Sequence, residues 1–230
     1  MGKIWIIIFF IVASNVAFAQ PYKTVKIFKP YNWMFGIHWN IVEDNGDKFG
    51  KLFDVSNSWN YLPYPSKITV DKYFKYGWSM ELATAYNKYE SSKIINLQTG
   101  VESHFFSFDV NGKYSFYTKY YPRAKWIDPY LTFGLGYTYR NANVAVHTPT
   151  LNLGLGLNIW IKNFGIQFHT SGKGGLFPGF WDKDNHENYL HHSIGFVYRT
   201  VDKPYTNGYF GKRKSKWAHG SRRFKKKKGQ

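Results

Sequence analysis

Strict alternation of apolar and polar residues most constrains what this chain can fold into. In the segment 32–41, every second residue is large and apolar: Trp33, Phe35, Ile37, Trp39 and Ile41. The positions between them hold smaller or more polar residues, namely Asn32, Met34, Gly36, His38 and Asn40. A period of two places these sets on opposite faces of a β-strand. The segment is therefore predicted to be a strand with one apolar face.

The same period recurs along the chain and predicts seven more strands, at 68–74, 78–87, 106–116, 131–140, 151–161, 164–171 and 190–199. In the last of them, only His192 breaks the apolar face. The links are long at 42–66, 88–103 and 173–188, moderate at 141–148 and short at 75–77, 121–126 and 162–163. Long and short links thus segregate to opposite ends, which is typical of outer-membrane barrels. The prediction is an all-β, eight-stranded, antiparallel, up-and-down transmembrane β-barrel.

A soluble sandwich or lipocalin-like barrel is the alternative, because it also alternates. Its apolar face would be the interior, however, and nothing in such a fold requires an apolar face as wide as that of 151–161. Aromatic residues next to the predicted strand ends favour the membrane barrel, because they predict two interfacial girdles. One would hold Tyr31, Trp33, Tyr76, Trp78, Tyr120, Tyr121, Trp126 and Tyr130, and the other Trp39, Tyr86, Tyr137 and Tyr139.

The amino-acid composition excludes several kinds of functional site and one class of membrane protein. The 230 residues contain no Cys, which excludes a disulfide framework, a Cys-ligated metal site and a cysteine nucleophile. The mean hydropathy of -0.44, with one short apolar run, excludes a bundle of transmembrane helices. We expect no cofactor and no metal site, with the acids Asp44, Asp47, Asp54, Asp182, Asp184 and Glu187 hydrated in the loops rather than binding a divalent cation.

The two ends of the chain differ from the predicted barrel. Residues 1–19 resemble a secretory signal peptide, with Lys3, the apolar run Ile4 to Val12 and the ending Ala17-Phe18-Ala19. An N-terminal membrane anchor is the alternative. We expect the barrel over 20–201 and a basic periplasmic tail over 202–230. This organisation predicts a protein of the Gram-negative outer membrane, in contact with its lipid and with both mature termini in the periplasm.

Eight strands enclose an interior that side chains can fill, so a wide pore is not expected. The inward set contains groups of both signs, predicted as an interior polar network: His38, Glu81, Asp109, Lys113, Arg140, His169, His191 and Arg199. Such groups must pair when removed from bulk water. One interpretation is a structural polar plug, and the other is a narrow ion path through the same groups.

Several segments resemble the barrel part of OmpA-type outer-membrane proteins of Bacteroidota. They are Asp44 to Phe53 with Ser58 to Ser66, Tyr86 to Tyr89, Pro129 to Tyr137, Ser171-Gly172-Lys173 and His191 to Arg199. The resemblance implies an eight-stranded barrel that serves envelope architecture rather than catalysis. Family members usually continue into a peptidoglycan-binding domain, for which the residues after Val201 leave no room.

The predicted tail instead carries eleven basic residues against one acidic residue, Asp202. A run of like charge repels itself and is expected to be disordered when free. Its predicted contacts are Lys212, Arg213, Lys214, Lys216, Trp217, Arg222, Arg223, Phe224, Lys225, Lys226, Lys227 and Lys228. An acidic periplasmic protein or peptidoglycan fits this charge, whereas the signal peptide argues against nucleic acid. A solvated tail without a partner is the alternative.

Together these features predict a non-catalytic barrel that is an envelope structural protein, or an accessory subunit of a secretion or assembly complex docked through its tail. The enzymatic alternative is a lipid A deacylase using His169 and Ser171, which stand two positions apart. Periodicity places both side chains inside the barrel, whereas acyl chains lie outside it. A narrow ion-conducting barrel is the remaining alternative.

Overall fold

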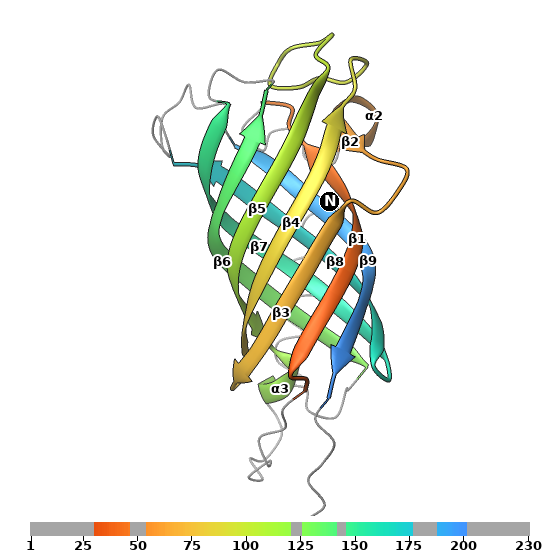
Figure 1. Cartoon of the computed structure of the whole chain (residues 1–230), viewed down its shortest axis with the longest axis vertical. Coiled ribbons are helices and arrows are strands. Elements are labelled where there is room, and N and C mark those ends of the chain that lie inside the picture. The colour runs from red at the N-terminus through yellow and green to blue at the C-terminus, as the bar shows by residue number, and fades with distance from the viewer. Residues whose placement is uncertain (1–29, 47–53, 121–125, 142–145, 177–187, 202–230) are drawn as a thin grey trace, which may run out of the picture.

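The computed structural model describes residues 30–46, 54–120, 126–141, 146–176 and 188–201, whose strands form one antiparallel barrel (Figure 1). The strands are β1 (Trp33–Glu43), β2 (Trp59–Tyr61), β3 (Lys67–Lys75), β4 (Trp78–Tyr89), β5 (Ser103–Ser115), β6 (Ile127–Arg140), β7 (His147–Ile161), β8 (Phe164–Gly175) and β9 (Tyr189–Thr200). Two short helices are α2 (Val55–Ser58) and α3 (Tyr117–Tyr120). Among the described residues, no helix is long and apolar enough to cross a membrane.

The barrel closes because β1 pairs with β9 along its whole length, from Trp33 opposite Thr200 to Glu43 opposite Leu190. On its other edge β1 pairs first with β3 and then with β2. The break between β2 and β3 holds Pro63 and Pro65, which lack the N–H that a strand ladder needs. β2 and β3 thus occupy one position in the wall, and the predicted eight-stranded antiparallel barrel is confirmed.

The two ends of the barrel differ in the length of the links between strands. Two-residue turns, Tyr76-Gly77 and Lys162-Asn163, join β3 to β4 and β7 to β8. Tyr76 and Gly77 both have positive φ, as the tight turns of β-hairpins require. The link containing α3 lies at this same end, which we call the short-turn end. The strand ends that the longer links join, from β1 to β2, β4 to β5, β6 to β7 and β8 to β9, lie at the opposite end, which we call the long-loop end.

The wall is apolar outside and polar inside. Large apolar side chains on the outer face are exposed, with Leu153 at 69% and Phe164 at 66%. The inward positions of the same strands are buried and hold Ser, Thr, Asn, Asp, Lys and His. A soluble barrel has the opposite arrangement, because water favours polar exterior groups. This distribution matches a lipid bilayer as the surrounding medium, so we treat the strands as membrane-spanning.

The predicted girdles are partly wrong. Trp33, Tyr76, Trp78, Tyr120 and Trp126 are exposed near the short-turn end, and Tyr86 and Tyr137 are exposed near the long-loop end. Tyr31 and Tyr130, by contrast, are 2% and 1% exposed and face the interior. Proximity to a strand end predicts that an aromatic residue lies near an end of the barrel, but it does not predict whether its side chain points outward or inward. Tyr130 occupies an inward-facing position of β6, and Tyr31 points into the barrel mouth.

Candidate functional site: the closed interior

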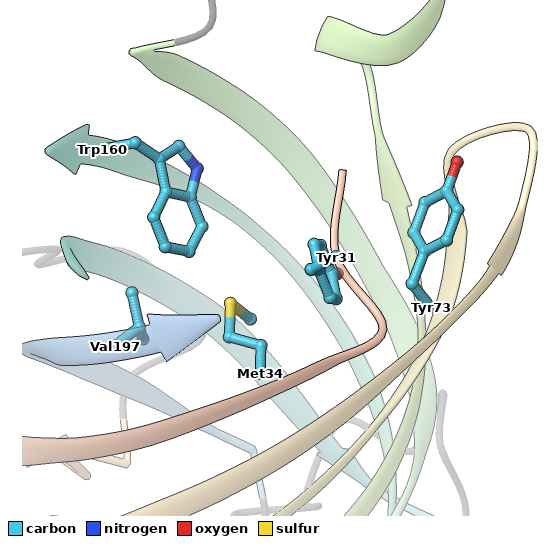
Figure 2. Packing of buried hydrophobic residues seen from close by; sticks show 5 residues of the cluster. All are labelled: Tyr31, Met34, Tyr73, Trp160 and Val197. Carbon is cyan, nitrogen blue, oxygen red and sulfur yellow. The ribbon is translucent and has the colours of Figure 1, made fainter. Parts of the chain in front are cut away.

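An apolar cluster closes the interior at the short-turn end. We call it the lower cluster, and it consists of Tyr31, Met34, Tyr73, Trp160 and Val197 (Figure 2). These residues come from the ends of β1, β3, β7 and β9 and from the segment before β1. None is more than 4% exposed, and the rings of Tyr31 and Tyr73 meet edge to face at 5.3 Å. Buried contact of this kind leaves little space for water.

A second apolar cluster, the upper cluster, closes the long-loop end. It consists of Val42, Tyr89, Ile95, Phe105 and Tyr189. Four of these residues are on strands, but Ile95 comes from the loop between β4 and β5 and is fully buried. The loop thus folds back over the barrel mouth and inserts an apolar side chain.

Backbone hydrogen bonds hold this loop in place. The N–H of Asn96 donates to the carbonyl of Asp44 at 2.7 Å, and the N–H of Ile94 donates to that of Asn57 at 2.7 Å. At Gly46, φ is +73°, and a Cβ would lie 2.9 Å from backbone atoms of Asn96. The two loops approach so closely that only glycine fits there without strain.

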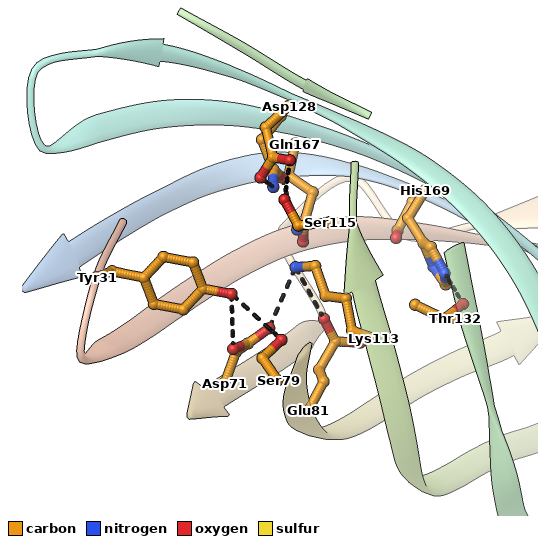
Figure 3. A network of polar contacts seen from close by, with 12 residues as sticks. Tyr31, Asp71, Ser79, Glu81, Lys113, Ser115, Asp128, Thr132, Gln167 and His169 are labelled. Atoms are coloured by element: carbon orange, nitrogen blue, oxygen red, sulfur yellow. Dashed lines mark hydrogen bonds and ion pairs between the residues drawn. The ribbon is translucent and has the colours of Figure 1, made fainter. Parts of the chain in front are cut away.

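Between the two clusters, charged side chains form ion pairs. Nζ of Lys113 on β5 lies 3.2 Å from Oδ2 of Asp71 and 3.7 Å from Oε2 of Glu81, within the network drawn in Figure 3. Lys113 also lies 4.1 Å from the ring centroid of Tyr130. A buried cation flanked by two carboxylates and an aromatic face keeps favourable partners in a low-dielectric interior.

Asp71 is also bound by uncharged donors. The hydroxyl of Tyr31 donates to its Oδ1 at 2.9 Å, and Ser79 donates to its Oδ2 at 3.1 Å (Figure 3). Burial raises the pKa of the Tyr31 phenol well above its ordinary value, and the charge of Asp71 adds to the effect. Tyr31 therefore stays protonated and remains a donor, so this bond joins the lower cluster to the ion pairs.

A second ion pair lies higher in the barrel. Nζ of Lys173 on β8 contacts both carboxylate oxygens of Asp109 on β5, at 2.7 and 2.6 Å. The amide of Asn152 on β7 donates to the same carboxylate at 3.0 Å. This pair crosses the interior between strands that are not neighbours in the wall. It therefore fills the lumen rather than lining it.

A third ion pair lies under the upper cluster. Nη1 of Arg140 lies 2.6 Å from Oδ2 of Asp44, which also accepts from the hydroxyl of Tyr89 at 2.8 Å. The Asp44 and Arg140 side chains are fully buried. The expectation of Asp44 as a hydrated loop acid was therefore wrong. β1 runs on to Glu43, which places Asp44 at the barrel mouth instead of in solvent.

Near the lower cluster, neutral donors stabilise Asp128. Its carboxylate accepts a hydrogen bond from Ser115 and one from Asn158 at 3.2 Å. Asn158 in turn accepts from Gln167 at 2.8 Å. These side chains come from β5, β6, β7 and β8, so the bonds tie four neighbouring strands together.

The middle of the interior is less fully paired. Nζ of Lys67 donates to Ser193 at 3.2 Å, and within the described residues it has no carboxylate within 4 Å. His191 has no partner with hydrogen-bonding geometry for either ring nitrogen in that part of the chain. His169 uses only Nε2, which lies 3.0 Å from Oγ1 of Thr132. Buried groups of this kind are the ones that internal water satisfies in folded proteins.

The structure places seven of the eight sequence-predicted network residues in the interior: His38, Glu81, Asp109, Lys113, Arg140, His169 and His191. Arg199 lies apart, at the short-turn end, where it donates to the carbonyl of Lys162 at 2.9 Å and stacks on Trp160. Sequence reasoning missed Asp71 and Lys173. Both could have been predicted as interior residues, because the alternation places each at an inward-facing position of its strand.

His169 and Ser171 do not form a catalytic pair. Both side chains are buried inside the barrel, as the periodicity predicted. His169 contacts Thr132, and the hydroxyl of Ser171 donates to the carbonyl of His191 at 3.4 Å. Neither side chain reaches the outer face where acyl chains lie. The enzymatic alternative based on these two residues therefore has no support in the geometry.

Other expectations fall outside the described residues. These are the signal peptide at 1–19, the tail at 202–230 and the loop acids Asp47, Asp182, Asp184 and Glu187. Within the described ranges, Asp54 binds the side chains of Asn57 and Ser56. The same ranges contain no group of three or more His, Cys, Asp or Glu side chains placed to hold a metal ion.

Comparison with known proteins found neither a matching family nor a matching curated protein. Solved structures do resemble the chain. The Neisserial surface protein A matches with a TM-score of 0.47 at 10% identity, covering 74% of this chain and 97% of that one. The outer membrane protein OprG from Pseudomonas aeruginosa matches with a TM-score of 0.46 at 10% identity, covering 75% and 97%.

A third similar structure is the N-terminal β-barrel domain of Pseudomonas aeruginosa OprF, with a TM-score of 0.41 at 13% identity, covering 72% of this chain and 95% of that one. The assignment of this chain as a closed barrel stands on the pairing of its own strands.

Proposed function

We propose that this chain is an outer-membrane β-barrel that anchors a periplasmic contact in the envelope and does not conduct ions. The observation that carries the proposal is the filled interior. The lower cluster and the upper cluster close its two ends, and the ion pairs of Lys113, Lys173 and Arg140 cross the space between them. A hydrated ion finds no continuous aqueous route through such packing.

The outer membrane is the location that suits this fold. An antiparallel barrel with an apolar outer wall and unequal loop lengths has its short turns in the periplasm and its long loops at the cell surface. In this orientation the chain enters and leaves the barrel, near residues 30 and 201, on the periplasmic side. The resemblance to OmpA-type barrels of Bacteroidota supports the same placement and a role in envelope architecture.

The basic tail is the segment that we propose binds a partner. Its eleven basic residues follow directly after β9 and would emerge on the periplasmic side. Attraction to an acidic protein of a larger outer-membrane complex, or to the carboxylates of peptidoglycan, follows from this charge. The barrel would then act as the membrane anchor and the tail as the docking segment.

Co-purification tests the docking role. Full-length protein and a variant ending at Val201 are extracted from native membranes in mild detergent, and bound proteins and peptidoglycan fragments are identified. A matched control replaces Lys225, Lys226, Lys227 and Lys228 by Gln, which keeps the length and removes part of the charge. We expect a partner with the full-length chain, less of it with the Gln variant and none after truncation. Equal recovery with all three proteins would contradict docking through the tail.

A further inference from the structure

Three polar side chains lie together on the outer face of the barrel, at the long-loop end. Glu43, Thr170 and His192 stand on β1, β8 and β9, at the outward positions of those strands. Each stands in a row of lipid-facing residues along its strand, next to Phe168 on β8 and Ile194 on β9. We call this group the outer polar cluster. Polar groups on an apolar wall are costly unless they are paired, so their arrangement calls for an explanation.

The cluster is a continuous chain of hydrogen bonds. Nε2 of His192 lies 3.1 Å from Oε2 of Glu43, and Nδ1 of His192 lies 3.1 Å from Oγ1 of Thr170. A carboxylate only accepts hydrogen bonds, so Glu43 selects the tautomer of His192 with its proton on Nε2. Nδ1 is then unprotonated and accepts the hydroxyl proton of Thr170.

Glu43 is itself fixed in place. Its Oε2 also accepts from the indole N–H of Trp59 at 3.1 Å, and its Oε1 accepts from the backbone N–H of Asp54 at 3.2 Å. The ring of Trp59 lies over that of His192, with centroids 5.4 Å apart. Glu43 and His192 are buried beneath this cover, whereas Thr170 is only half-buried. The hydroxyl is thus the member of the chain nearest to an incoming molecule.

A hydroxyl, an imidazole and a carboxylate in this order form the constellation that activates an oxygen nucleophile. The imidazole removes the hydroxyl proton during attack, and the carboxylate stabilises the imidazolium that results. The position of the cluster indicates its substrate. Phe168 on β8 and Ile194 on β9 are exposed next to the cluster on the apolar outer wall, so the ester-linked acyl chains of membrane lipids are the molecules that reach it.

We propose that Thr170, His192 and Glu43 form a hydrolytic site for ester-linked acyl chains of lipids in the leaflet at the long-loop end. Oγ1 of Thr170 attacks the ester carbonyl carbon, and its proton passes to Nδ1 of His192. The bond to the lipid alcohol breaks, and the alcohol leaves with that proton. Water then attacks the acyl-threonine, releases the fatty acid and returns the proton to Oγ1. This activity goes beyond the anchoring role and is independent of it.

The test uses full-length protein in phospholipid vesicles, with fatty-acid release and covalent labelling by a fluorophosphonate as readouts. The variants are Thr170→Val, Thr170→Ser, His192→Gln and Glu43→Gln. Two controls keep the outer polar cluster intact. Thr84→Val changes a half-buried outward Thr on β4, and Ser171→Ala changes an inward neighbour of Thr170. The heat-dependent gel shift of barrel proteins confirms that each variant is folded.

We expect the label on Thr170 in the unmodified chain, on the replaced residue in Thr170→Ser and in both controls at Thr170. Thr170→Val is expected to remove it, and His192→Gln to lower the rates of labelling and release by about 100-fold or more. Glu43→Gln is expected to lower both rates as well. A folded unmodified chain that is not labelled and releases no more fatty acid than Thr170→Val would overturn the proposal. The outer polar cluster would then only join β1, β8 and β9, and the anchoring role would be unaffected.

Discussion

Nζ of Lys113 and Oδ2 of Asp71 lie 3.2 Å apart in the interior of the barrel, and neither side chain is exposed. The two residues are on β5 and β3, with β4 between them in the wall. The contact therefore joins strands that share no backbone hydrogen bonds. Interior ion pairs of this kind make the lumen part of the folded structure.

Replacing Lys113 by Met should destabilise the barrel strongly. The change leaves Asp71 and Glu81 buried without their cation, and breaking a buried ion pair in this way costs about 3–5 kcal/mol. Urea unfolding in lipid vesicles measures the loss. Lys88→Met is the control, because Lys88 lies on the outer face of β4 and is exposed. Equal unfolding midpoints for the two variants would show that Lys113 has no role in stability.

Lys173 and Asp109 should be energetically coupled. Each single variant, Lys173→Met or Asp109→Asn, leaves one buried group without its partner. The double variant has neither charge, so its loss in unfolding free energy should be smaller than the summed losses by about 0.5–3 kcal/mol. A double-mutant cycle in the same unfolding assay gives this coupling. Additive losses would mean that the two side chains do not interact.

A charge in the middle of the outer wall should impair insertion. Leu153 lies at the centre of β7 and is 69% exposed on the apolar face. Arginine at the bilayer midplane costs about 2–4 kcal/mol, so Leu153→Arg should shift the folding equilibrium in vesicles by that amount. Tyr64→Arg, in the exposed link between β2 and β3, should have little effect. The reverse order would contradict the position of the membrane.

Ile95 should hold the loop between β4 and β5 over the barrel mouth. Ile95→Asn removes a buried apolar contact of the upper cluster, so the loop should open and be cleaved faster in limited proteolysis. Leu97→Asn is the matched control, because Leu97 belongs to the same loop but is 61% exposed. Cleavage of both variants at the rate of the unmodified chain would show that the insertion of Ile95 does not fix the loop.

The alternation in the sequence predicted the wall but not the contacts inside it. A period of two fixes the face of each residue, which is why His38 and Lys113 were placed inward correctly. It does not say which inward residues meet across the lumen, because partners such as Asp44 and Arg140 are far apart in the chain and brought together only by barrel closure. The pattern also did not locate the ends of the strands. Because β1 extends to Glu43, Asp44 is buried at the barrel mouth instead of lying in a hydrated loop.

The outer polar cluster shows the same limit. His192 interrupted an otherwise apolar face, and this was visible in the sequence. Its partners were not, because Glu43 and Thr170 meet it only when β9 lies between β8 and β1. A polar residue on an otherwise apolar face therefore indicates where a site could be. The residues that complete the site become known only from the pairing register of the strands.

The conductance of the full-length protein in planar lipid bilayers tests the closed interior most directly. Protease protection of the strands in parallel vesicles establishes that the protein is inserted, and a wide porin reconstituted in the same way shows that openings are detectable. We predict no discrete openings above the background of the lipid alone. Stable openings that recur with each insertion would contradict a lumen closed by the upper and lower clusters.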